Sequence, residues 1–181
     1  MGNGIVEKLN KEFHLEVQWI GYELHPETPP EGVPLSRLFP GFSPEAMVER
    51  LRTAGAPYGV SFNTVEVLSN SRLALEATEF ARDSGKFKEA HERFFESYFL
   101  EGKDIGNLKT VLEVCESLGL DVKALEDALR SGAYPDRLQK ARALGAEHGV
   151  AGIPAFIFNG EKKIVGAQQY ETFVRVLSEL V

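Results

Sequence analysis

The stretch Val150-Ala151-Gly152-Ile153-Pro154-Ala155-Phe156 is the most informative part of this sequence. It places a proline at the entrance to an apolar run that has the composition of a β-strand. Pro154 alone fits two structures. It can follow a cis peptide bond beside a site, since cis bonds are almost confined to X-Pro pairs, or it can be a trans proline that begins an edge strand. The sequence that follows has to decide between them.

A hairpin and a helix follow this proline. Asn159-Gly160 separates the apolar run 155–158 from a second one, 163–165, and Asn-Gly in that position is the strongest short signal for a β-hairpin. The chain then ends in an amphipathic helix, because its apolar residues recur at helical spacing. These residues are Tyr170, Phe173, Val174, Leu177 and Leu180. Together with Gly166-Ala167-Gln168, this order of elements resembles that around the cis-proline of thioredoxin-like folds, and the resemblance implies a cis bond before Pro154.

The other end of the chain opens with a short helix and a strand. Ile5, Leu9 and Phe13 repeat every four residues, as one face of a helix does. Apolar and polar residues then alternate over residues 15–19, which predicts a strand. Between residues 25 and 41 five prolines oppose regular structure, so this segment is expected to be a loop.

The middle of the chain is a block of helices. Ser43-Pro44-Glu45 supplies an N-cap, a proline at the first helical position and an early acid. Asp121 and Pro135 begin two later helices in the same manner. Cys115 lies on an apolar helical stripe, where a cysteine is expected to be an inert part of the core.

This order of elements predicts an α/β unit into which an all-α domain is inserted. The α/β unit consists of residues 1–42 and 138–181, and the inserted helical domain of residues 43–137. A helix in a βαβ unit needs a strand on both sides, and the opening helix has one only after it. The first strand of the unit is therefore missing from these residues and is expected to precede Met1.

Nearly the whole chain resembles the DsbA family, in particular its FrnE-like members, which are thiol-disulfide oxidoreductases with a thioredoxin-like fold. The stretch 150–156 with its hairpin and helix resembles the cis-proline loop of that fold. Glu23-Leu24-His25-Pro26 and Pro29-Pro30-Glu31-Gly32 are similar to the loop after the strand in this subgroup. The motifs similar to its helical insertion are Asn70-Ser71-Arg72-Leu73-Ala74, Gly85-Lys86, Tyr98-Phe99 and Asp104-Ile105.

The resemblance implies dithiol-disulfide exchange with a protein or peptide substrate. The family places Cys-x-x-Cys at the first turn of the first helix, where helix N–H groups stabilise a thiolate. The present chain has one cysteine, Cys115, so the motif is absent and is expected upstream of Met1. The chain by itself is expected to lack redox activity.

The resemblance also assigns the site residues. Pro154 is the catalytic-site residue, expected to pack against the attacking thiolate. The backbone of Gly152 and Ile153 is expected to bind an extended substrate peptide by strand addition. Gln168 is expected at the rim of the same groove. No cofactor is implied, and the four histidines show no metal-ligand spacing, so no metal site is predicted.

Two other functions remain open. The first is a glutathione-using enzyme of the kappa transferase or 2-hydroxychromene-2-carboxylate isomerase type, which shares the fold and the proline loop. Such relatives tend to carry an Asp-Arg pair after the hairpin glycine, where this chain has Gln168-Gln169. The second is a non-catalytic peptide-binding or chaperone-like module that keeps the groove at Pro154 and uses no thiol.

Composition limits the partners and the compartment. The net charge of −7 gives a nucleic-acid role little electrostatic support. No apolar run approaches the roughly 18 residues that span a bilayer, and the first residues do not form a signal peptide. A single cysteine excludes an internal disulfide, so the cytoplasm is the expected compartment. A missing strand leaves unpaired edges, which permit strand exchange in a homodimer.

Overall fold

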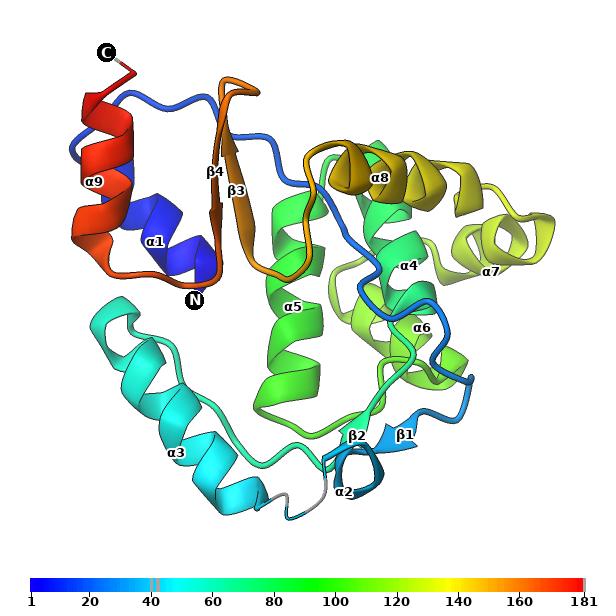
Figure 1. The fold of residues 1–181 in the computed structure, drawn as a ribbon. Helices are drawn as coiled ribbons and strands as arrows, with labels where there is room; N and C mark the ends of the chain where they lie inside the picture. The colour runs from blue at the N-terminus through cyan, green and yellow to red at the C-terminus, as the bar shows by residue number, and fades with distance from the viewer. Residues whose placement is uncertain (40, 42, 181) are drawn as a thin grey trace.

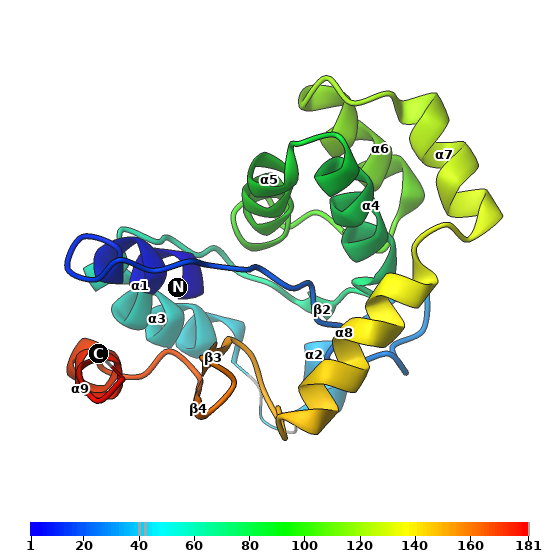
Figure 2. The same cartoon turned by 90° about the horizontal axis from the view of Figure 1, so that it is seen from above.

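The computed structural model describes residues 1–39, 41 and 43–180. Figure 1 shows a bundle of helices beside a smaller unit in which a β-hairpin lies near both ends of the chain. Helix α8 (Pro135–Glu147) runs from the bundle to this hairpin, as Figure 2 shows from above. The ends of the sequence thus come together around the hairpin, as expected for an α/β unit that carries an inserted block.

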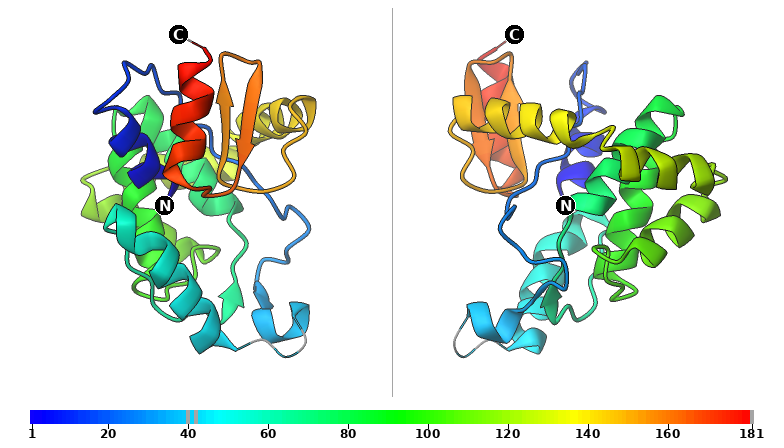
Figure 3. Two further views of the ribbon diagram at one scale, coloured as in Figure 1. Left: turned by 60° about the vertical axis from the view of Figure 1, so that its left-hand side comes forward. Right: turned by 90° about the vertical axis from the view of Figure 1, so that its right-hand side faces the viewer.

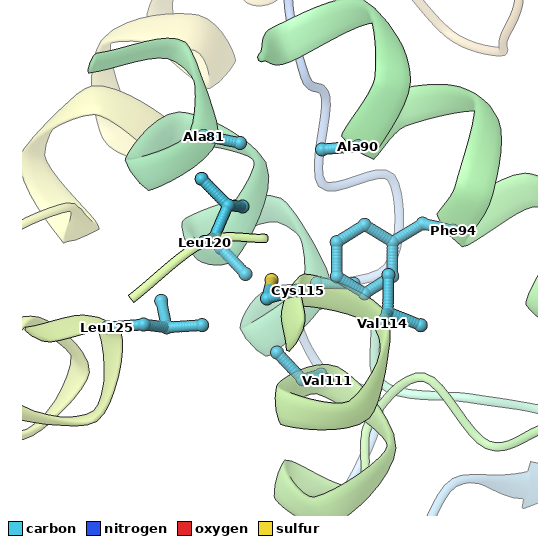
Figure 4. Packing of buried hydrophobic residues seen from close by; sticks show 10 residues of the cluster. Ala81, Ala90, Phe94, Val111, Val114, Cys115, Leu120 and Leu125 are labelled. Atoms are coloured by element: carbon cyan, nitrogen blue, oxygen red, sulfur yellow. The ribbon is translucent and has the colours of Figure 1, made fainter. Parts of the chain in front are cut away.

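The bundle consists of α4 (Arg72–Asp83), α5 (Phe87–Phe99), α6 (Leu108–Ser117) and α7 (Val122–Ser131). Its core is made of small and aliphatic side chains with one phenylalanine, and the Cys115 side chain lies among them (Figure 4). The prediction that this cysteine belongs to the core is confirmed. The buried members of this cluster are Ala74, Ala77, Ala81, Ala90, Phe94, Val111, Val114, Cys115, Leu120 and Leu125.

Side-chain caps fix the starts of two helices where the sequence predicts them. The Asp121 carboxylate accepts hydrogen bonds, both 3.0 Å long, from two backbone N–H groups in the first turn of α7. At the start of α3 (Pro44–Gly55), Ser43 Oγ accepts a hydrogen bond of 3.2 Å from the Ala46 N–H. A short 3₁₀ helix, η1 (Ala56–Tyr58), follows α3 directly.

The predicted hairpin forms with the expected turn. Strand β3 (Ala155–Phe158) pairs antiparallel with β4 (Lys162–Val165), and Phe156 lies opposite Ile164. Asn159 and Gly160 have φ angles of 51° and 75°. Two successive positive φ angles are what a tight hairpin turn requires, and Asn-Gly adopts them at little cost.

A second hydrophobic core joins α1 (Gly2–Leu9), the hairpin and α9 (Tyr170–Ser178). Phe173 is fully buried there, and its ring meets Phe156 edge-on with 4.8 Å between centroids. Figure 3 shows α1 and α9 next to each other at the hairpin. The buried residues of this cluster are Ile5, Leu9, Ile164, Phe173 and Leu177.

The strand predicted over residues 15–19 is not formed. Residues 14–23 belong to no helix or strand of the structure. Across the described part of the chain, the backbone of this segment has one hydrogen-bond partner, Arg82, whose Nη2 donates to the Trp19 carbonyl over 2.9 Å. The alternating pattern places Leu15 against the second core but supplies no neighbouring strand for a ladder.

The loop predicted over residues 25–41 contains short regular elements, so that expectation is wrong for residues 33–38. Strand β1 (Val33–Pro34) pairs with β2 (Val67–Leu68), and α2 (Leu35–Leu38) follows at once. Pro34 directly precedes α2 and has φ −56°, which suits the fixed φ of proline. The contact that forms β1 comes from residues more than thirty positions away, which the local pattern does not reveal.

The predicted domain boundaries stay a prediction. Helix α8 begins before residue 138 and reaches both the bundle and the loop 150–154, which we call the proline loop. Helix α8 also contacts residues 14–23, because the Tyr22 ring lies directly against Gly145 and leaves no room for a Cβ there. This close approach fixes the distance between α8 and residues 14–23.

Candidate functional site

The loop before β3 is held in place by a lysine from the neighbouring strand. Lys163 Nζ donates hydrogen bonds to the carbonyl oxygens of His148 (2.7 Å) and Gly149 (2.6 Å). Gly149 has φ +60°, a conformation that favours glycine and turns the chain away from the end of α8. The loop therefore leaves α8 in a defined direction and enters β3 at Pro154.

Pro154 lies beside the start of α1. The Ile153–Pro154 peptide bond is cis. A Cβ built on Gly2 would lie 3.2 Å from Pro154 Cβ and 3.7 Å from the end of the Phe156 ring. The amino-terminal turn of the first helix and the proline loop are therefore in direct contact, although more than 150 residues separate them.

Gly152 and Ile153 leave their backbone groups available. Within the described residues, neither their N–H nor their carbonyl groups make a hydrogen bond. The Ile153 side chain is 50% exposed. An exposed segment with free donors and acceptors can pair with another extended chain. The structure thus places the two residues predicted to bind substrate next to Pro154 in one loop.

Gln168 is near this loop but is turned back on its own segment. Its Nε2 donates a hydrogen bond of 3.0 Å to the Val165 carbonyl. The turn it belongs to is joined to the proline loop, because the Gly166 N–H donates to the Pro154 carbonyl over 2.7 Å. Gln168 is exposed and borders the loop through this turn, while its amide is already engaged.

A histidine that the sequence analysis did not single out also lies near the start of α1. His91 of α5 contacts the rings of Phe87 (5.8 Å), Phe95 (4.7 Å) and Trp19 (5.4 Å between centroids). The sequence contains one indication of this cluster, the spacing of four between Phe87, His91 and Phe95, which puts all three on one face of α5. Phe95 is 51% exposed, so this face of α5 does not point into the core of the helical bundle. The neighbouring Phe94 is buried in that core.

Polar contacts join this face of α5 to α1. Asn3 Nδ2 donates to Glu92 Oε1 over 3.3 Å, and Lys88 Nζ lies 4.0 Å from Glu7 Oε1. Burial lowers the pKa of His91, Glu92 opposes this effect, and the positive amino terminus lowers the pKa further. A histidine in this position is neutral near pH 7, and its ring lies among those of Phe87, Phe95 and Trp19.

A family model for the DSBA-like thioredoxin domain matches residues 1–178. The chain belongs to this DSBA-like thioredoxin family. The predicted fold class, thioredoxin-like α/β with a helical insert, is therefore confirmed.

Three known proteins are similar to this DSBA-like chain in sequence or in structure. The uncharacterized protein YwbO of Bacillus subtilis (strain 168) is 27% identical over 184 residues, which cover 99% of this chain and 89% of YwbO. The crystal structure of a probable DsbA oxidoreductase from Streptomyces coelicolor is similar with a TM-score of 0.87 and 23% identity, over 98% of this chain and 82% of the other. A 2-hydroxychromene-2-carboxylate isomerase is similar with a TM-score of 0.71 and 19% identity, over 98% and 87%.

The one thiol of this DSBA-like chain is in an environment that makes it unreactive. Cys115 is fully buried in the bundle, and this burial raises its pKa to about 11. At neutral pH such a thiol is protonated, and the thiolate is the nucleophilic form. No group of three or more candidate metal ligands occurs among the described residues, and none of the described helices is long and apolar enough to cross a membrane.

Proposed function

We propose that this DSBA-like protein takes part in dithiol-disulfide exchange on protein or peptide substrates. The observation that carries the proposal is the contact between Pro154 and the first turn of α1 at Gly2. A thiol at that turn would lie beside the proline loop, and the unpaired N–H groups of a helix start stabilise a thiolate. Membership of the family supports the same reaction.

The proline loop would hold the substrate in this reaction. Gly152 and Ile153 offer unpaired backbone groups and one exposed apolar side chain. An extended peptide that pairs with them brings its disulfide to the start of α1. A thiolate there attacks one sulfur, a mixed disulfide forms, and the other substrate sulfur leaves as a thiolate. A second thiol then displaces the product and completes an enzyme disulfide.

Residues 1–181 do not supply the thiols for this exchange. Cys115 is the only cysteine, and it is buried and protonated. We therefore propose that the reacting thiols belong to a part of the polypeptide outside these residues. The 181-residue chain should show no insulin reduction above background, and clear turnover would contradict this proposal.

A cysteine placed at the proposed site tests its geometry. In Gly2→Cys the new thiol should have a pKa at least about one unit below that of Ser131→Cys, because Gly2 begins α1 whereas Ser131 ends α7, where the helix dipole has the opposite sign. The pH dependence of alkylation by iodoacetamide measures both values. Equal values in two folded variants would remove the argument for a thiolate site at α1.

The peptide-binding role of the loop has its own readout. In the Gly2→Cys protein, Ile153→Asp should slow reaction with an extended peptide disulfide several-fold and leave the reaction with a small aromatic disulfide unchanged. Equal slowing with both reagents would mean that the loop does not hold peptide.

The two other functions lead to different results. The similarity to a 2-hydroxychromene-2-carboxylate isomerase fits the glutathione-using alternative. Against it, the Gln168 amide is already bound to the Val165 carbonyl, and the turn 166–169 carries no cation to hold a glutathione carboxylate. Calorimetric titration with glutathione would reveal such a site. Peptide binding by the full-length protein without any exchange would instead identify a non-catalytic binding module.

A further inference from the structure

The proline loop is supported along its length by one neighbouring strand. Residues in β4 or directly after it contact the chain just before the loop, near the middle of the loop and at its end. In that order, the contacts are Lys163 with Gly149, Val165 with Gly152, and Gly166 with Pro154. Of these three contacts, the one made by Lys163 uses a charged side chain.

Lys163 bonds two carbonyl groups that no backbone group satisfies. Within the described residues, no backbone N–H donates to the carbonyl oxygens of His148 or Gly149. These oxygens lie just past the end of α8, where the unpaired carbonyls of a helix favour a positive charge. An ammonium group has three N–H donors and can bond both oxygens at once. Lys163 therefore fixes the direction in which the chain leaves α8.

The middle of the loop depends on these supports. The backbone groups of residues 151–153 make no hydrogen bond to any described residue. They are free to pair with a peptide, but they can do so only in one backbone conformation. A loop that has to be ordered during binding loses conformational entropy, and this loss weakens the complex. The contacts that hold the ends of the loop should therefore strengthen peptide binding.

We propose that Lys163 is a positioning residue for peptide binding at the proline loop. By holding the chain at Gly149, it keeps Gly152 and Ile153 in the conformation that pairs with an extended peptide. This inference rests on the function proposed above and adds a residue to its binding step. Among the described residues, Lys163 makes no hydrogen bond or ion pair with α1, so it should not alter a thiol at the start of that helix.

The neighbouring lysine provides a matched control. Lys162 is exposed on the same strand, and its Nζ lies 3.3 Å from Glu179 Oε2 instead of near the loop. Lys163→Met keeps a long side chain and removes its donors, and Lys162→Met makes the same change one residue away. Lys163→Arg restores a cation with N–H donors. Because both lysines are exposed, circular dichroism should show the same fold in all three variants.

Amide hydrogen exchange followed by NMR measures how firmly the start of the loop is held. The Gly149 N–H donates to the Ala146 carbonyl over 3.0 Å, and the Val150 N–H donates to the Gly145 carbonyl over 2.8 Å. Lys163→Met should speed the exchange of both amides about three-fold or more, because their turn opens more often. Lys162→Met should leave both rates unchanged, and Lys163→Arg should restore most of the protection.

Reaction with a peptide measures the effect on binding. In the Gly2→Cys protein, the rate of reaction with an extended peptide disulfide should saturate as the peptide concentration rises. Adding Lys163→Met should raise the half-saturating concentration about five-fold and leave the maximal rate and the pKa of the new thiol unchanged. Lys162→Met should change none of these quantities, and Lys163→Arg should bring the half-saturating concentration back toward its original value.

The outcomes separate this inference from the function on which it rests. If the rate saturates but Lys163→Met leaves the half-saturating concentration unchanged, or Lys162→Met raises it equally, this inference is wrong and the proposed function stands. A changed maximal rate or thiol pKa in Lys163→Met, or unchanged exchange at Val150, would also overturn it, because the lysine would then act otherwise than through the loop. A rate that never saturates with peptide would refute both.

Discussion

The close approach of α1 to η1 allows a substitution to be predicted in sign and size. Gly4 lies inside α1, and a Cβ at this position would sit 2.6 Å from Tyr58 Cβ and 3.1 Å from the Tyr58 carbonyl oxygen. Ordinary contacts of a Cβ are 3.4 Å or longer. Because the obstacle includes backbone, Gly4→Ala can be accommodated only by moving α1 away from η1.

Two opposing effects determine how much Gly4→Ala changes the free energy of unfolding. Replacing glycine by alanine inside a helix stabilises it by about 1 kcal/mol. Forcing an extra carbon into a packed interface costs about 1–3 kcal/mol. We expect Gly4→Ala to lower the free energy of unfolding by about 1 kcal/mol, which for a chain of this size lowers the melting temperature by about 2–4 °C.

Thermal unfolding followed by circular dichroism measures this change. Gly2→Ala is the matched comparison, because its Cβ would lie 3.2 Å from the nearest atom, Pro154 Cβ, whereas a Cβ at Gly4 would lie only 2.6 Å from Tyr58 Cβ. It should change the melting temperature less than Gly4→Ala does. A melting temperature that rises in Gly4→Ala would refute the packing of α1 on η1 described above.

Other predictions concern the helical bundle. Removing the N-cap of α7 by Asp121→Ala should cost about 1 kcal/mol in urea unfolding, whereas Asp127→Ala, at an exposed ion pair with Arg130, should cost less than half of that. Cys115 should react with a thiol reagent only as fast as the protein unfolds. Because burial raises the Cys115 pKa from 9.0 to about 11, stability from this group is complete below pH 9 and is lost as the pH rises toward 11; Cys115→Ala should lack this loss.

The parts of the fold that were predicted correctly depend on local chemistry. Asn159 and Gly160 define the hairpin turn by their own φ angles, and Asp121 and Ser43 cap helices through residues two or three positions ahead. The 150–154 loop is expected at the candidate site because the hairpin and helix follow it directly, and its role there stays a prediction. In each case the interaction that decides the structure lies within a few residues.

The incorrect predictions concern structures that depend on residues distant in sequence. A strand needs a partner, and alternation over residues 15–19 cannot show that the described chain provides none. Strand β1 (Val33–Pro34) was missed because its partner, β2, is distant in sequence. The position of His91 near α1 likewise depends on a contact between distant residues, the hydrogen bond from Asn3 of α1 to Glu92 of α5, and a spacing of four on one helix does not reveal it.

The path of α8 has a mechanical consequence. This one uninterrupted helix begins at the bundle and ends at the loop that leads to Ile153. The Tyr22 ring packs against the last turns of α8, and Lys163 Nζ donates hydrogen bonds to the two carbonyl groups just beyond them. A substitution that shifts α8 where it leaves the bundle should therefore displace the 150–154 loop as well.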